Sequence, residues 1–356
     1  MARGGLIERY GPYLEIDGKD RPVSLHEGAT PLIEAPRLAE WVAPGARLFL
    51  KYEGLNPTGS FKDRGMVTAV THARANGAES VVCASTGNTA ASAAAYAARA
   101  GMRCIVLIPD GKIALGKLAG SIAYGAQVVA IDGNFDDALK LVRELADQTP
   151  IALVNSVNPA RLQGQQTAAW EVIEDLGQSP DWLCLPVGNA GNISAYWMGF
   201  SGPFAPLGER GRGEGRLPRL LGAQAAGAAP LLAGHPIADP ETKATAIRIG
   251  NPARWHQALD ALKESCGHLT SVTDEEIFDA YREVARREGV FCEPSSAAGI
   301  AGLRKAVLSG EVQPEGQTIV CVLTGHGLKD PASATEDAPP IKKITGTLNA
   351  LMEAVA

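Results

Sequence analysis

Short apolar segments alternate with amphipathic segments along most of the chain, and this alternation constrains the fold more than any other feature. Strands are predicted at 48–52, 81–84, 104–108, 127–131, 151–154, 182–187, 219–223 and 318–323. Helices are predicted at 37–42, 89–100, 115–124, 135–146, 163–176, 193–200, 274–288, 297–308 and 348–356. Strands that are separated by helices pair in parallel with right-handed crossovers. The sequence therefore predicts an α/β fold with mostly parallel twisted sheets flanked by helices.

The length of 356 residues is too great for one simple core, so two domains or one large domain are expected. Counting the predicted elements gives a smaller domain, 52–155, and a larger domain made of 1–51 and 156–356. The segment 201–218 is rich in Gly, Arg and Pro and is predicted to be an exposed loop. The segment 235–255 has no clear period and is predicted to be irregular.

The composition of the chain argues against several classes of protein. A net charge of −6 argues against a nucleic-acid partner. The first ten residues lack an apolar signal core, and no apolar run approaches the length of a membrane span, which predicts a cytoplasmic protein. The six cysteines form no CxxC pair, and four of them lie within predicted strands, so buried free thiols are expected: Cys83, Cys104, Cys184 and Cys321.

The sequence contains near-matches to two common motifs, and each lacks one required residue. His26 and Glu27 begin like the zinc motif HExxH, but Thr30 occupies the position of the second histidine. The segment 111–118 nearly matches the phosphate loop GxxxxGK[ST], but Leu118 replaces the hydroxyl that would bind Mg²⁺. A metal is therefore not expected, and a nucleotide hydrolase remains a weak alternative that ATP binding with magnesium would test.

The segment 56–65, NPTGSFKDRG, carries the first candidate for chemistry. Its first four residues are typical of a turn, and helical spacing of apolar residues begins near Ser60. Lys62 therefore lies in the first turn of a helix, where the positive field of the backbone lowers the pKa of an amine. A neutral amine can attack a carbonyl and later move protons. The alternative is that Lys62 is simply one of 33 basic residues at the surface.

Three predicted strands end in polar, Gly-bearing loops, where parallel sheets bind their ligands. The loop 85–89, Ser-Thr-Gly-Asn-Thr, can hold a carboxylate at a helix N-terminus, although a plain helix cap would use the same residues. The loop 188–192 suits one phosphate, and a simple turn is its alternative. The loop 324–327 offers the hydroxyl of Thr324, which could also be a buried, satisfied threonine.

Taken together, an activated lysine, a cradle for one phosphate and a loop for a carboxylate fit a cofactor with one aldehyde and one phosphate. Pyridoxal 5′-phosphate is such a molecule. A hydroxyl at a strand end could then meet its pyridine nitrogen.

Five segments of the chain jointly resemble the threonine synthases, which belong to the fold-type-II, tryptophan-synthase β-like pyridoxal-phosphate enzymes. They are NPTGSFKDRG at 56–65, STGNTAAS at 85–92, PVGNAGNI at 186–193, ATAIRIGNP at 244–252 and LTGHGLKD at 323–330. The resemblance runs from about position 27 to 329. Serine and threonine dehydratases and cysteine synthases share looser forms of each segment, but the dehydratases usually have a more glycine-rich phosphate loop.

The resemblance implies a role for each matching residue. Lys62 would be the catalytic residue and would bind the cofactor aldehyde, and Asn88 would contact the cofactor's 3′-oxygen. Thr324 would meet the pyridine nitrogen, and the cofactor phosphate would be held by Gly188, Asn189, Ala190, Gly191 and Asn192. The substrate carboxylate would be held by Ser85, Thr86 and Asn88. The substrate phosphate would be held by Thr89, Ser156, Arg161 and Asn189.

The resemblance also implies the reaction, in which O-phospho-L-homoserine and water give L-threonine and phosphate by γ-elimination and β-addition of water. The enzyme would be a carbon–oxygen lyase, the last in threonine biosynthesis, and a homodimer with its cofactor between the two domains. Two alternatives stay open on this scaffold, a dehydratase acting on threonine or serine and an amino-acid sensor without turnover.

Overall fold

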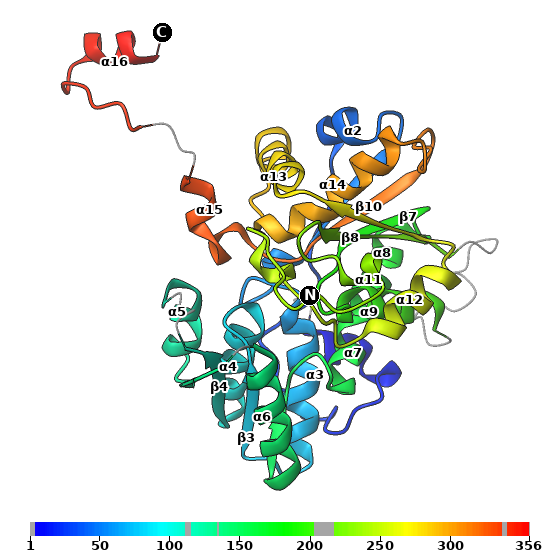
Figure 1. Ribbon diagram of the computed structural model, residues 1–356, viewed down its shortest axis with the longest axis vertical. Helices are drawn as coiled ribbons and strands as arrows, with labels where there is room; N and C mark the ends of the chain where they lie inside the picture. Colours follow the sequence, from blue (N-terminus) through cyan, green and yellow to red (C-terminus); the bar gives the residue numbers. More distant parts are fainter. Residues whose placement is uncertain (1–3, 111–114, 134, 203–216, 337–339, 356) are drawn as a thin grey trace.

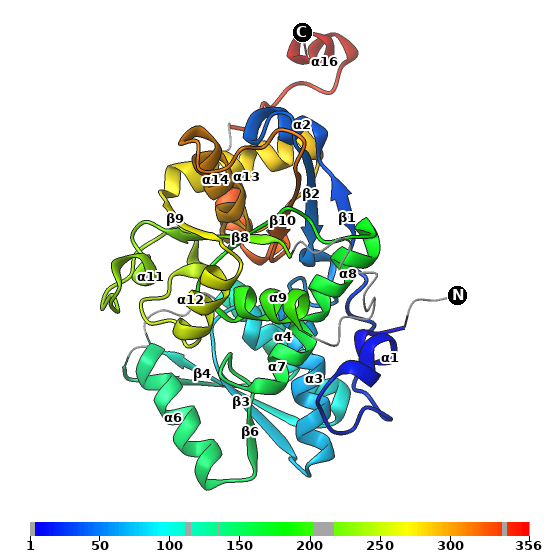
Figure 2. The ribbon, with the colours of Figure 1, turned by 90° about the vertical axis from the view of Figure 1, so that its right-hand side faces the viewer.

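The structure is a computed structural model that describes residues 4–110, 115–133, 135–202, 217–336 and 340–355. Its strands form two separate sheets, seen one above the other in Figures 1 and 2. The larger sheet has the order β1-β2-β10-β7-β8-β9 and the smaller has the order β5-β4-β3-β6. All neighbouring strands pair in parallel except β1 with β2, which confirms an α/β fold with mostly parallel sheets.

The strands of the larger sheet are β1 (Leu32–Glu34), β2 (Arg47–Tyr52), β7 (Trp182–Pro186), β8 (Arg219–Ala225), β9 (His268–Val272) and β10 (Thr318–Leu323). The strands of the smaller sheet are β3 (Ser80–Ala84), β4 (Arg103–Pro109), β5 (Gln127–Ile131) and β6 (Ile151–Leu153). Every predicted strand is present within two residues at either end.

Helices cover both faces of each sheet. They are α3 (Lys62–Ala75), α4 (Asn88–Ala100), α5 (Leu115–Ala123), α6 (Phe135–Gln148), α7 (Pro159–Gln165), α8 (Thr167–Leu176), α9 (Gly191–Ser201), α12 (Trp255–Glu264), α13 (Asp274–Glu288) and α14 (Pro294–Leu308). The other α-helices are α1 (Leu6–Tyr10), α2 (Pro36–Val42), α11 (Pro230–Ala233), α15 (Pro331–Thr335) and α16 (Leu348–Val355), the last of which stands away from the body in both views.

The two-residue period of the strands divides each sheet into two apolar faces. In β7, Trp182 and Cys184 pack toward α2, α13 and α14, whereas Leu183 and Leu185 pack toward α8, α9 and α12. The smaller sheet packs one face on α3 and α4 and the other on α6. Because both faces are covered, strand residues are apolar almost throughout, which is why these strands were predictable.

Some elements differ from prediction. The helix predicted at 163–176 is divided into α7 and α8 at Gln166, and α7 begins earlier because the side chain of Asn158 caps it through Ala160 N at 2.9 Å. The elements α1, β1, β9 and α12, among others, were not predicted. The strand β1 has three residues, and β9 is a partly exposed edge strand, so neither has a strong apolar pattern.

Five cysteines are buried and free, as expected of those in strands, whereas Cys266 is exposed. Positions 203–216 of the predicted loop and 111–114 of the near-match to a phosphate loop lie outside the described residues. Within the described part of the chain, no helix is both long and apolar enough to cross a membrane.

Candidate active site

Three helices begin at residues that the sequence singled out. Lys62 is the first residue of α3, Asn88 of α4 and Gly191 of α9. Each helix presents unpaired N–H groups and a partial positive charge at that end. The helices α4 and α9 follow directly from the carboxyl ends of β3 and β7, whereas α3 follows the short helical turn η2 (Glu53–Leu55). The site therefore has several helix ends that are suited to bind an anion.

Lys62 lies close to the end of β10 although the two are distant in sequence. The backbone N–H of Phe61 donates to the carbonyl of Thr324 at 3.0 Å, and Ser60 pairs with Gly325 in a short antiparallel bridge. Burial lowers the pKa of the Lys62 amine to about 7, and the neighbouring Arg161 acts in the same direction, while Glu293 opposes them. A substantial fraction of Lys62 is therefore neutral near pH 7.

The helix α7, which carries Arg161, packs unusually closely against α3, which begins at Lys62. A Cβ at Gly65 would lie 2.8 Å from the Arg161 carbonyl oxygen, and one at Gly164 would lie 1.8 Å from the Arg64 carbonyl oxygen. Only glycine fits at these two positions. The guanidinium of Arg161 is fully buried and donates from Nη1 to the carbonyl of Val154. Its Nε and Nη2 have no partner among the described residues, so they are available to an anion.

The carboxyl group of Glu293 accepts hydrogen bonds from two of the predicted site residues. Nδ2 of Asn88 donates to its two carboxylate oxygens at 2.9 and 3.2 Å, and Oγ1 of Thr324 donates to Oε1 at 3.2 Å. Asn88, Thr324 and Lys62 are thus brought together around one buried acid. Burial raises the pKa of Glu293, while the bonds from Asn88 and Thr324 and the charges of Lys329 and Lys62 lower it.

The loop 188–192 has the backbone of an anion cradle. Ala190 adopts φ 62°, a left-handed conformation that is uncommon outside glycine and is typical of functional loops. Nδ2 of Asn192 is buried without a partner among the described residues. A Cβ at Gly191 would lie 3.9 Å from Cβ of Ser156, so the loop borders Ser156.

A second arginine, Arg254, lies beside these residues. It donates from Nε to the carbonyl of Ser156 at 3.2 Å and from Nη2 to that of Val157 at 2.9 Å. Its backbone N–H donates to the carbonyl of Asn189 at 3.3 Å. Burial lowers the pKa of Arg161 to about 10, and the charge of Arg254 acts in the same direction. Ser156, Arg161 and Asn189 are thereby gathered around one strongly positive region.

The remaining predicted residues lie on the loop before α4 and in its first turn. Ser85, Thr86 and Thr89 are partly buried there, and Oγ of Ser85 accepts from the N–H of Gly87 at 3.2 Å.

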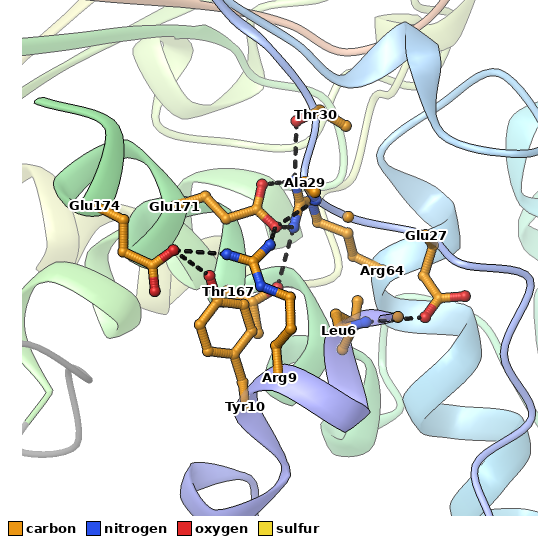
Figure 3. A network of polar contacts seen from close by, with 12 residues as sticks. Leu6, Arg9, Tyr10, Glu27, Ala29, Thr30, Arg64, Thr167, Glu171 and Glu174 are labelled. Atoms are coloured by element: carbon orange, nitrogen blue, oxygen red, sulfur yellow. Dashed lines mark hydrogen bonds and ion pairs between the residues drawn. The ribbon is translucent and has the colours of Figure 1, made fainter. Parts of the chain in front are cut away.

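A buried ion network fixes the segment that carries Lys62. Arg64, two residues further along α3, is fully buried and donates to Glu53 and to Glu171 at 2.6–2.9 Å. Figure 3 shows Glu171 between Arg64 and Arg9, with the Tyr10 hydroxyl on Glu174 nearby. Burial would raise the pKa of Glu171, but Arg64 and Lys51 outweigh it and hold that pKa well below its usual value. The network ties α3 to α8 and to the N-terminal helix.

This arrangement defines an α/β enzyme in which a lysine with a lowered pKa lies among several anion-binding groups. Solved structures share the fold. A threonine deaminase from T.th. is 26% identical, covers 90% of this chain and 98% of its own, and superposes with a TM-score of 0.71. A cysteine synthase from Entamoeba histolytica, 22% identical, covers 89% of this chain and 90% of its own with a TM-score of 0.73.

Sequence comparison identifies the family. Residues 23–325 match the family described as pyridoxal-phosphate dependent enzyme. A threonine synthase from Synechocystis is 59% identical over 94% of this chain and 85% of its own length. A threonine synthase from Mycobacterium leprae is 55% identical over 98% of this chain and 95% of its own length. The chain therefore belongs to the pyridoxal-phosphate dependent enzymes and, within them, to the threonine synthases.

The residues present fit pyridoxal 5′-phosphate. Lys62 supplies an amine of lowered pKa for the aldehyde, and the loop 188–192 supplies backbone N–H groups and the unpaired Nδ2 of Asn192 for a phosphate. Asn88 and Thr324 present an amide and a hydroxyl beside Lys62 for the ring.

Sequence analysis missed three residues of this site, namely Glu293, Arg254 and Lys329. Glu293 precedes Pro294 at the start of α14, where an acid is ordinary at a helix N-terminus. Lys329 donates to the carbonyl of Thr58 at 3.0 Å, and burial lowers its pKa. Its place within the segment LTGHGLKD was a signal that sequence analysis could have used.

Proposed function

We propose that this protein is a threonine synthase, which converts O-phospho-L-homoserine and water to L-threonine and phosphate. The observation that carries the proposal is the buried Arg161, whose unpaired Nε and Nη2 lie near Lys62. A substrate with a phosphate of its own needs an anion site in addition to those for the cofactor phosphate and the substrate carboxylate, and a dehydratase acting on threonine or serine does not. The 59% identity to a threonine synthase supports the same assignment.

We assign the cofactor contacts as follows. Lys62 would hold the aldehyde, Asn88 the 3′-oxygen and Thr324 the pyridine nitrogen, while the phosphate would lie on Gly188, Asn189, Ala190, Gly191 and Asn192. Bound pyridoxal 5′-phosphate supplies an aldehyde for an amino group and a conjugated ring that withdraws electrons from the reacting carbon.

The chain's own residues would position the substrate and move its protons. Ser85, Thr86 and Asn88, with the N–H groups that begin α4, would hold the substrate carboxylate. Thr89, Ser156, Arg161 and Asn189 would hold its phosphate, for which the guanidinium of Arg161 is suited because it can donate two parallel hydrogen bonds. Lys62, whose pKa is about 7, can accept the proton from Cα and return it at neutral pH.

A two-substrate assay tests the proposal. Purified protein supplied with pyridoxal 5′-phosphate and O-phospho-L-homoserine should release inorganic phosphate and form threonine. Supplied with threonine alone, it should form little 2-oxobutyrate. The opposite pattern would identify a dehydratase. Saturable binding of either ligand without any product would identify a sensor.

We further propose the domain division, the oligomeric state and the location. The smaller domain, 52–155, contains all four strands of the smaller sheet, and 1–51 with 156–356 contains nearly all residues of the larger. The family resemblance supports a homodimer in the cytoplasm. Light scattering on the purified protein tests the dimer, and a monomer at micromolar concentration would contradict it.

A further inference from the structure

Gln165 carries a buried amide that the assignments above do not use. It is the last residue of α7, is 5% exposed, and lies one helical turn after Arg161. Residues four apart lie on the same face of a helix, so the two side chains leave α7 toward the same neighbours. Oε1 of Gln165 has no hydrogen-bond partner among the described residues. A buried polar atom in this condition needs a physical reason, because an unpaired one is costly.

Two glycines show where each end of this amide lies. A Cβ at Gly65 would lie 2.6 Å from Nε2 of Gln165 and 3.1 Å from Cβ of Arg161, so both side chains pass α3 at this glycine. A Cβ at Gly191 would lie 4.0 Å from Oε1 of Gln165 and 3.9 Å from Cβ of Ser156. The nitrogen end of the amide therefore lies against α3, and its oxygen end lies toward the start of α9 and Ser156.

The polar groups near this oxygen otherwise offer hydrogens. Nε and Nη2 of Arg161 and Nδ2 of Asn192 are buried donors without a partner in the described part of the chain, and Arg254 adds positive charge. The hydroxyl of Ser156 can donate or accept, whereas Oε1 of Gln165 can only accept. An anion gains from every donor at such a site. It gains from the one acceptor only if the anion itself carries a hydrogen.

Phosphate and sulfate differ in this single respect. At pH 8 both anions are tetrahedral and carry two negative charges, but hydrogenphosphate keeps one O–H group and sulfate has none. The O–H group of hydrogenphosphate can donate to Oε1 of Gln165, whereas sulfate would bring a lone pair against a lone pair. The lone acceptor therefore favours phosphate among anions of the same shape and charge.

We propose that Gln165 is a specificity-determining residue of the substrate-phosphate site, where its Oε1 accepts the hydrogen of a phosphate oxygen. The inference rests on the proposed function, because it concerns the phosphate of O-phospho-L-homoserine that is assigned there to Arg161. The same arrangement suits the leaving group. As the bond between Cγ and oxygen breaks, its electron pair stays on the oxygen. An ester with one negative charge then departs as hydrogenphosphate with two and keeps its hydrogen on Gln165, while Arg161 and Arg254 meet the added charge.

Anion binding to the cofactor-loaded protein provides the test. Wild-type protein with bound pyridoxal 5′-phosphate is titrated in a calorimeter with inorganic phosphate and, separately, with sulfate at pH 8. The cofactor's own phosphate then occupies its loop, which leaves the substrate site for the added anion. We expect phosphate to bind about tenfold or more tightly than sulfate, because it makes one additional charge-assisted hydrogen bond.

Three variants assign the preference to this residue. Gln165→Met removes the acceptor and should bring the ratio of the two affinities close to one. Gln163→Met is the control, because Oε1 of Gln163 accepts from the N–H of Glu15 at 3.1 Å and from Nε2 of Gln166 at 3.0 Å, on another face of α7, and it should leave the ratio unchanged. Arg161→Met should weaken binding of both anions, and undiminished binding would mean that they lie elsewhere and would overturn the inference.

A second pair of anions decides the matter on the wild type if Gln165→Met does not fold. Arsenate and selenate are larger than phosphate and sulfate, and at pH 8 only arsenate keeps a hydrogen. Arsenate should bind more tightly than selenate by a ratio similar to that of phosphate over sulfate. Equal binding within both pairs would overturn the inference without any variant.

The same preference for phosphate in wild type and Gln165→Met also overturns the inference. Failure of the proposed function is a different result. Wild-type protein that releases phosphate from O-phospho-L-homoserine but binds phosphate and sulfate equally overturns the inference alone. Wild-type protein that shows the preference, and loses it in Gln165→Met, but releases no phosphate from this substrate overturns the proposed function alone.

Discussion

The lowered pKa of Lys62 makes a quantitative prediction about how fast the cofactor-free protein captures an aldehyde. With an ordinary pKa of 10.5, an amine is neutral only about 0.03% of the time at pH 7, whereas a pKa of about 7 leaves about half of it neutral. The neutral fraction of Lys62 should rise about tenfold from pH 6 to pH 8 and then level off. An ordinary lysine would gain about a hundredfold over that interval and continue to gain up to pH 10.

Stopped-flow absorbance after mixing cofactor-free protein with pyridoxal 5′-phosphate measures this capture. The reaction of N-acetyl-lysine amide with the same aldehyde serves as the reference. Dividing the protein's rate by the reference rate at each pH cancels the effect of the ionisation of the aldehyde itself. The Lys62 rate should reach a plateau above pH 8 while the reference continues to climb. A protein rate that parallels the reference at every pH would refute the reasoning.

Two substitutions with opposite expected effects can separate the causes of the lowered pKa of Lys62. Burial is the largest cause, and Arg161 adds to it, so Arg161→Met should move the midpoint of the capture profile to higher pH. Glu293 opposes both, so Glu293→Gln should move the midpoint to lower pH. Shifts in the same direction for both variants would show that packing, and not charge, dominates.

Three further predictions concern single residues. Lys62→Ala should abolish both the visible absorbance of the bound cofactor and phosphate release, and retention of either would contradict the lysine assignment. Arg64→Met leaves the buried Glu53 without its ion-pair partner and Glu171 with only Lys51 and Arg9. It should cost about 3–5 kcal/mol in the free energy of unfolding, measured with urea; a loss below about 1 kcal/mol would show that the network relaxes. Gly325→Ala should displace the carboxyl of Glu293 and weaken cofactor binding in a titration, whereas the control Gly120→Ala, whose new methyl meets nothing closer than 3.7 Å, should not.

Much of the fold was predictable because its signals are local. Each strand of the two sheets is short and apolar, and each crossover helix has its own period, so neighbouring residues alone define the element. The helix predicted from near Ser60 begins at Lys62, and the strand predicted at 127–131 has those bounds. The strand β9 and the helix α12 were missed because half-exposed elements carry weaker apolar patterns.

The groups around Lys62 were less predictable, because they come from distant parts of the chain. Glu293 is 205 positions from Asn88 and 31 from Thr324, and its own neighbourhood is that of an ordinary helix start. The approach of Arg161 to Lys62 depends on glycines in two different helices. A sequence pattern reports which residues can carry chemistry, but contacts between separate helices decide what their pKa values become.

The electrostatics of the site suggest how one lysine can serve several proton transfers. The charge of Arg161 helps to keep Lys62 neutral before any anion binds. A phosphate on Arg161 would cancel that charge, and the pKa of Lys62 would rise, which makes it a stronger base while the substrate's phosphate is in place. As phosphate left, the charge of Arg161 would be exposed again and Lys62 would give up its proton more readily. Proton uptake and release by a single amine would thus follow the binding and departure of the substrate's own phosphate.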